Sequence, residues 1–194
     1  MRSLVTLAAL AATGLAVPAM AEEGVAPDST SFAGPRIEGL AGWDRVQNHG
    51  NDSGVNYGVA AGYDVQHGST VFGVDAEAAD STTKRCVGSR KPADPRLCAR
   101  AGRDLYVGGR IGEVVGGRTL LYAKVGYDNS QVRASLDDGT TRSHASKNLD
   151  GVRAGAGAEY ALSRNSFVKA EYRYTDGQDH WSRNQLLGGV GFRF

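Results

Sequence analysis

The sequence lacks a long apolar run of the kind that crosses a membrane as a helix. Its one substantial apolar segment, residues 4–17, is shorter than the roughly 20 residues that a spanning helix needs. Glycine is abundant instead, with 27 residues in a chain of 194, which is too many for a helical bundle. The sequence therefore excludes a helical membrane protein.

An excess of charge of one sign is also missing. The chain has 22 basic and 21 acidic residues, and removal of Arg2 with an N-terminal leader would leave it neutral. Because nucleic-acid binding needs a basic surface, we expect no nucleic-acid partner.

The N-terminus has the features of a secretory signal peptide. Arg2 precedes the apolar run, and the small-residue site Ala19-Met20-Ala21 follows it. An uncleaved membrane anchor is the alternative, but the run is short and ends at a good cleavage site. We predict a signal peptide over residues 1–21, cleaved after Ala21, and a single domain over residues 22–194.

Cysteine is scarce, with only Cys86 and Cys98. In an exported chain, an even number of cysteines indicates a disulfide. A metal pair is the alternative, but no histidine lies between or beside them and the C-x₂-C spacing of zinc sites is missing. We expect a disulfide that staples one loop.

Beyond the leader, the dominant pattern is alternation. In residues 36–44, one parity is Ile, Gly, Ala and Trp, and the other is Arg, Glu, Leu, Gly and Asp. A period of two with one apolar side predicts a strand between two environments. Similar segments predict strands at 36–44, 55–65, 71–80, 102–113, 119–129, 149–161, 167–176 and 182–194. The sequence thus predicts an all-β protein, an eight-stranded antiparallel up-and-down transmembrane β-barrel.

The predicted connections are of two kinds. Segments 66–70, 114–118 and 162–166 are short, whereas 47–54, 81–101 and 130–148 are longer and polar. In outer-membrane barrels the short turns are periplasmic and the long loops are extracellular.

Side-chain parity separates a lipid face from a lumen. Apolar residues such as Val59, Val125 and Val190 share one parity, on which we find no charge. A charge facing lipid at mid-membrane would cost roughly 2–4 kcal/mol, so the opposite parity must point inward. The predicted lumen charges are Arg36, Glu38, Asp75, Glu77, Arg110, Lys124, Arg153, Glu159, Lys169, Glu171, Arg173 and Arg193.

Aromatic residues fall at two heights on the predicted strands, as expected for rings that prefer membrane interfaces. The predicted outer girdle is Trp43, Tyr57, Tyr127 and Tyr174, and the predicted periplasmic girdle is Tyr63, Tyr160, Phe192 and Phe194.

A soluble β-sandwich or lipocalin-like barrel would also alternate. Its large apolar residues would face inward, and its charges would mix with Ser, Thr and Asn on the outside. Here the charged parity is shared with glycines such as Gly62 and Gly155, which suits a narrow lumen filled by long charged side chains.

Several motifs resemble one protein family. They are Gly62-Tyr63-Asp64, Leu121-Tyr122-Ala123-Lys124-Val125-Gly126-Tyr127, Gly155-Ala156-Gly157-Ala158-Glu159-Tyr160, Lys169-Ala170-Glu171-Tyr172-Arg173-Tyr174 and Gly191-Phe192-Arg193-Phe194. Together they resemble the outer-membrane β-barrel domain of the OmpA-like, Omp25/31 and opacity-type porin-like proteins. The resemblance implies residence in the outer membrane of a Gram-negative bacterium, in contact with lipid and lipopolysaccharide. It also implies insertion by the assembly machinery through Phe194 and a surface or envelope-integrity role.

Catalysis has little support in the sequence. The four histidines, His49, His67, His144 and His180, all fall in predicted loops or turns. His144-Ala145-Ser146 places a base near a hydroxyl, but a nucleophile needs hydrogen-bond geometry that sequence proximity does not supply. Lumen carboxylates interspersed with Arg and Lys are explained by ion pairs. We expect no enzymatic activity.

Two other functions stay open as alternatives. External loops that hold His49, His144, His180 and Trp181, with Tyr127 nearby, could bind haem or another ligand, although the residues themselves predict no cofactor. A narrow porin is the other alternative, but an eight-stranded barrel is just wide enough for side chains to fill its interior. We therefore expect a structural surface barrel that interacts through its loops.

Overall fold

The computed structural model describes residues 30–47, 51–89, 91, 96–137, 139, 141–177 and 181–194. The predicted signal peptide and its cleavage site at Ala21 lie outside the described residues, as do His49 and His180. The described part of the chain contains no helix with the length and apolarity to cross a membrane.

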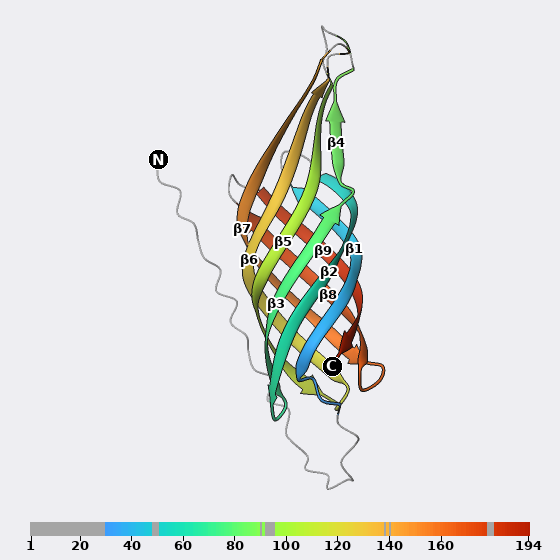
Figure 1. Cartoon of the computed structure of the whole chain (residues 1–194), viewed down its shortest axis with the longest axis vertical. Helices are drawn as coiled ribbons and strands as arrows, with labels where there is room; N and C mark the ends of the chain where they lie inside the picture. The colour runs from blue at the N-terminus through green and yellow to red at the C-terminus, as the bar shows by residue number, and fades with distance from the viewer. Residues whose placement is uncertain are drawn as a thin grey trace, which may run out of the picture.

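The described residues form antiparallel strands that close into a barrel (Figure 1). They are β1 (Gly34–Gln47), β2 (Asn51–His67), β3 (Thr70–Ser81), β4 (Lys84–Val87), β5 (Arg96–Val115), β6 (Thr119–Asp137), β7 (Arg142–Ala161), β8 (Ser166–Gly177) and β9 (Trp181–Arg193). Pairing runs around a ring from β1 through β2, β3 and β5 to β9, and β9 pairs with β1. The predicted closed, eight-stranded antiparallel barrel is confirmed, with β4 as an additional strand outside the ring.

The two ends of the barrel differ (Figure 1). Short turns join β2 to β3, β5 to β6 and β7 to β8 at one end, where the C-terminus also lies. Gly68 and Gly116 adopt positive φ angles in two of these turns, a conformation that glycine adopts without strain. Short turns of this kind are periplasmic in outer-membrane barrels, so the tall opposite end corresponds to the predicted extracellular side.

The extracellular end is built from strands rather than from loops. β4 pairs with β5, and β5, β6 and β7 continue together beyond the barrel to Arg96, Asp137 and Arg142. We call this four-stranded sheet the extension; it comprises residues 84–87, 96–101, 131–137 and 142–148 (Figure 1). The prediction that 81–101 and 130–148 are loops is wrong for most of their described residues, because only short stretches such as 82–83 and 88–89 lie outside strands.

These segments were not predicted as strands because apolar and polar residues alternate only where one side of a strand is buried or faces lipid. The extension is rich in exposed charged and small polar residues, so its composition is typical of a loop. Backbone pairing with neighbouring strands holds it in β-structure instead. The predicted loop 47–54 is likewise mostly strand, because β1 reaches Gln47 and β2 begins at Asn51.

A β-bulge separates the extension from the barrel along β5. Ala101 pairs with Val132, whereas Asp104 pairs with Ser130, so two residues of β5 oppose one of β6. Since side chains alternate along a strand, this extra residue exchanges the two faces of β5. Asp104 below the bulge is buried in the barrel, while Arg100 above it is exposed on the outer side.

The interior of the barrel also contains apolar side chains besides the predicted lumen charges. Phe32, which precedes β1, packs near the periplasmic end with Val71, Leu120 and Tyr122. Val71, Leu120 and Tyr122 follow the lumen parity of their strands, and together with Phe32 they fill space between the charged side chains.

Candidate functional site

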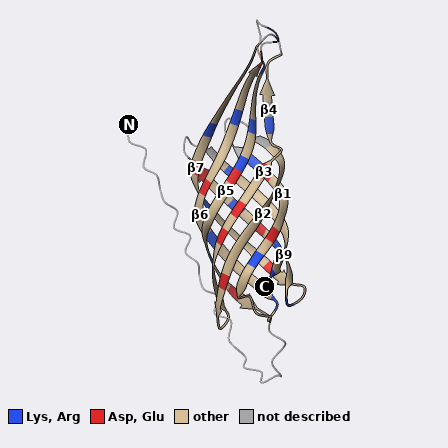
Figure 2. Cartoon of the chain, viewed as in Figure 1, with Lys and Arg blue, Asp and Glu red and all other residues tan. Residues whose placement is uncertain are grey.

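The most distinctive chemical feature of the barrel is its charged interior. All twelve residues predicted to line the lumen are at most 7% exposed. They come from every strand of the ring except β2, and Figure 2 shows basic and acidic positions interspersed over the barrel. These side chains meet inside the barrel because each occupies an inward-facing position of its strand.

The cluster nearest the periplasmic end is centred on Asp64. Its carboxylate accepts hydrogen bonds from Nε of Arg36 and from Nε of Arg110, each at 2.9 Å, and from Nη2 of Arg193 at 3.3 Å. Glu159 joins the cluster by ion pairs with Arg110 and with Arg193, the second at 3.0 Å. Three guanidinium groups therefore share two carboxylates from different strands.

The middle cluster is centred on Glu171. Nζ of Lys124 lies 2.9 Å from its Oε1, Nζ of Lys169 lies 3.2 Å from its Oε2, and Arg173 also pairs with it. The hydroxyl of Tyr122 donates to Oε2 of Glu171 at 2.5 Å. All four groups that contact this carboxylate thus come from strands of the barrel, β6 and β8.

The remaining predicted acids link the clusters to one another. Glu38 pairs with Arg36 and with Lys169, the latter at 2.5 Å, and Asp75 pairs with Arg36. Glu77 pairs with Lys124 and lies 2.7 Å from Arg173. The network is therefore continuous from the periplasmic end upward.

An outer cluster closes the extracellular end of the lumen. Nη2 of Arg153 lies 2.8 Å from Asp104, and Nη1 of Arg183 lies 2.6 Å from the same carboxylate. Arg183 also pairs with Asp44, which accepts a hydrogen bond from Thr83 at 2.7 Å.

Five charged members of this network were missing from the predicted set: Asp44, Asp64, Asp104, Asp128 and Arg183. The signal that could have found them is the same parity, because Asp64 follows Gly62 and Asp128 follows Lys124 at the alternating spacing. They were missed because they lie toward strand ends, where a charge is not by itself an anomaly. With them, the buried set contains eight basic and nine acidic residues, so it is nearly balanced in charge.

The aromatic residues predicted for the two girdles all lie on the outside of the barrel. Their exposed fractions range from 43% for Tyr174 to 71% for Phe194. The other members, all exposed, are Trp43, Tyr57, Tyr63, Tyr127, Tyr160 and Phe192. Around them the outer wall exposes aliphatic side chains such as Val59 and Val125, which suits contact with lipid.

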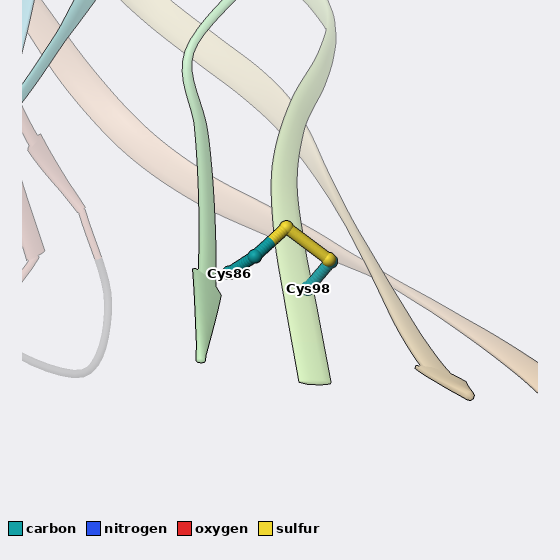
Figure 3. The surroundings of a disulfide bond; sticks show 2 residues. All are labelled: Cys86 and Cys98. Atoms are coloured by element: carbon teal, nitrogen blue, oxygen red, sulfur yellow. A yellow bond between two sulfur atoms is a disulfide. The ribbon is translucent and has the colours of Figure 1, made fainter. Parts of the chain in front are cut away.

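The two cysteines form a disulfide within the extension (Figure 3). Cys86 of β4 and Cys98 of β5 face each other directly in the register, with 4.1 Å between their Cα atoms. The bond therefore fastens the short β4 to a strand of the barrel, rather than closing a loop without regular structure.

The histidines do not assemble into a site in the described part of the chain. His67 ends β2 at the periplasmic side, and His144 lies on β7, so placing these two outside the strands was wrong. No hydrogen bond joins His144 to Ser146, although both are described. Within the described ranges, no three His, Cys, Asp or Glu residues are grouped so that they could hold a metal ion.

Residues 7–194 match the family model described as outer membrane protein beta-barrel domain. A 25 kDa outer-membrane immunogenic protein of Brucella ovis is 29% identical over 142 residues, which are 71% of this chain and 62% of that protein. The chain thus spans less than two thirds of the length of that relative.

Solved structures show the same fold at low sequence identity. Ail, the attachment invasion locus protein of Yersinia pestis, aligns with a TM-score of 0.58 and 18% identity over 84% of this chain and 100% of Ail. Neisserial surface protein A aligns with a TM-score of 0.55 and 20% identity over 84% of this chain and 98% of that protein.

Proposed function

Since this chain belongs to the outer membrane protein β-barrel domain family and resides in the outer membrane of a Gram-negative bacterium, we propose that it is a structural, surface-displayed barrel. It strengthens the envelope and interacts with its surroundings through the extension. It performs no catalysis.

The observation that carries this proposal is the filled lumen. Ion pairs cross the interior from the Asp64 cluster at the periplasmic end to the Arg153 cluster at the extracellular end. Leu120 and Phe32 fill the space between charged groups near the periplasmic end. An interior packed in this way leaves the outer surface as the place where the protein acts.

The outside of the barrel supports the membrane part of the proposal. The apolar wall and its two aromatic girdles contact lipid, and the extracellular end contacts lipopolysaccharide. Phe194 is exposed at the periplasmic end of β9, where the assembly machinery would recognise it during insertion.

Single-channel recording of the refolded protein in planar bilayers tests the closed lumen against the narrow-porin alternative. We expect no stable conductance steps. As a matched control, Arg153→Ala combined with Arg173→Ala removes two long side chains from the lumen and should produce steps, which shows that inserted protein is detectable. Stable steps from the unaltered protein would instead favour the porin.

The envelope role requires a separate measurement. A strain that lacks the gene should become more sensitive to detergent, and expression of the intact chain should restore resistance. Unchanged sensitivity would contradict a contribution to envelope integrity, independently of the conductance result.

A further inference from the structure

The extension concentrates positive charge. Its residues, 84–87, 96–101, 131–137 and 142–148, include seven of the 22 Lys and Arg residues of the chain but only one of its 21 Asp and Glu residues. Figure 2 shows the basic positions as bands across β4 to β7 above the barrel. Because the charge of the chain as a whole is nearly balanced, the ion pairs inside the barrel do not account for this basic surface.

Three cations form a row across neighbouring strands. Lys84 of β4 is opposite Arg100 of β5, and Arg100 is opposite Arg133 of β6. Residues paired in an antiparallel sheet share a face, and like charges directly opposite one another destabilise it. The row is therefore unfavourable for the isolated protein.

No carboxylate in the described part of the chain relieves this repulsion. Neither Lys84 nor Arg100 has an acidic partner there, and Arg133 donates from Nε to the amide oxygen of Gln131 at 3.0 Å. All three line a hollow of about 310 Å³, together with Ser135 and His144. The hollow thus offers several donors and no acidic side chain.

The position of the row relative to the membrane follows from a second, adjoining hollow. Arg100 and Arg133 line it together with Tyr57, a residue of the outer aromatic girdle. Asp80 is its only carboxylate, and this group accepts a hydrogen bond from the backbone N of Ser81 at 2.7 Å. Because the girdle marks the membrane interface, the guanidinium groups lie at the height of the outer-leaflet headgroups.

The β-bulge places this row on the outward side of the extension. On β6, Arg133 shares the outward parity of Tyr127, and the exchange of faces at the bulge brings Arg100 to the same side. The opposite face of the extension carries Val87, Leu97 and Leu136.

We propose that Lys84, Arg100 and Arg133 bind the phosphate groups on the sugar headgroups of outer-leaflet lipopolysaccharide. Guanidinium groups bind phosphate by paired, charge-assisted hydrogen bonds, and the ammonium of Lys84 adds a point charge. His144 borders the site. This proposal rests on residence in the outer membrane and not on whether the lumen conducts.

The test compares the unfolding of the refolded protein in neutral phosphatidylcholine vesicles with and without lipid A. Lipid A with its phosphates should raise the temperature at which the folded barrel loses its heat-modifiable gel mobility, because ligands that bind the folded state stabilise it. Lipid A from which the phosphates have been removed should raise it less.

The decisive variant is Arg100→Gln with Arg133→Gln. It should lose at least half of the phosphate-dependent rise, and in neutral vesicles it should melt at the same or a higher temperature, because the repulsion is gone. Arg118→Gln with Arg164→Gln removes two exposed arginines at the periplasmic turns and should keep the full rise.

Three outcomes would overturn the proposal. A full phosphate-dependent rise in the Arg100 and Arg133 variant would show that these residues do not bind the headgroup. An equal loss of stability in neutral vesicles would show that they are only structural. A rise produced by free inorganic phosphate in neutral vesicles, at constant ionic strength, would assign the site to a soluble anion instead.

Discussion

A charged side chain inside this barrel is stable only while its partners are present. Arg110 illustrates this, because it pairs with Asp64 and Glu159 on two other strands. Its guanidinium carbon also lies 5.1 Å from the centroid of the Tyr122 ring. Removing one member of a buried ion pair leaves the other charge without compensation. The interior is therefore sensitive to single substitutions.

We predict that Arg110→Ala or Glu171→Ala lowers the temperature at which the barrel loses its heat-modifiable mobility. The loss of stability should be about 3 kcal/mol, at the lower end for a broken buried pair because other cations still contact the same carboxylates. Arg118→Ala, at an exposed turn, is the control and should have little effect. Unchanged melting of both lumen variants would mean that these side chains do not lie in the interior.

Neighbouring residues on β6 should respond in opposite ways because they face opposite sides. Val125 is 58% exposed on the wall, whereas Lys124 is buried beside Glu77 and Glu171. We predict that Val125→Arg impairs insertion into vesicles, at roughly 2–4 kcal/mol for a charge at mid-membrane. Lys124→Gln should insert well, because Arg173 still pairs with both glutamates. Equal insertion of the two variants would contradict the register of this strand.

Among the elements, β4 is the least supported by pairing. It has four residues and pairs with β5 alone, so the Cys86–Cys98 bond is its main covalent restraint. Closing a loop of this size restricts the unfolded chain by about 3 kcal/mol at most. Since the flanking strands already confine the segment, the effect of the bond is mainly local.

We predict that Cys86→Ser with Cys98→Ser leaves barrel insertion nearly unchanged but allows β4 to separate from β5. Trypsin added outside should then cut within segment 84–96 faster than in the disulfide-bonded protein, measured by gel and mass spectrometry. Dithiothreitol applied to the unaltered protein should reproduce this result. Two free thiols found by labelling the unreduced, denatured protein would contradict the bond itself.

The elements also show where prediction from the sequence stops. Membrane-spanning segments are predictable because lipid forbids charge on one parity, and Val125 beside Lys124 reveals that constraint directly. The surroundings proposed for the extension, water and headgroups, impose no such rule on Arg133 or Ser135. Its strands depend on pairing between distant segments, which a single sequence does not display.

For the molecule as a whole, the same distinction separates the barrel from its surface. The ring of strands and the inward placement of residues such as Arg36 and Glu171 follow from alternation. Pairing between individual charges, such as Arg183 with Asp44, depends on which strands become neighbours when the ring closes. The cation row at Arg100 depends on a bulge that no local sequence pattern marked.

The continuous pairing of β6 with β7 makes the height of the extension depend on the number of residues in these two strands. At roughly 3.3 Å per residue, β6 advances about 33 Å along its length from Tyr127 at the interface to Asp137 at its end. With no break in pairing between β6 and β7 over this distance, the reach of the tip above the membrane is set by the number of residues. Shortening both strands by two residues would lower the tip and keep every side chain on its own side. A change of one residue in β5 would instead turn Arg100 inward, so the length of the extension can change only in even steps.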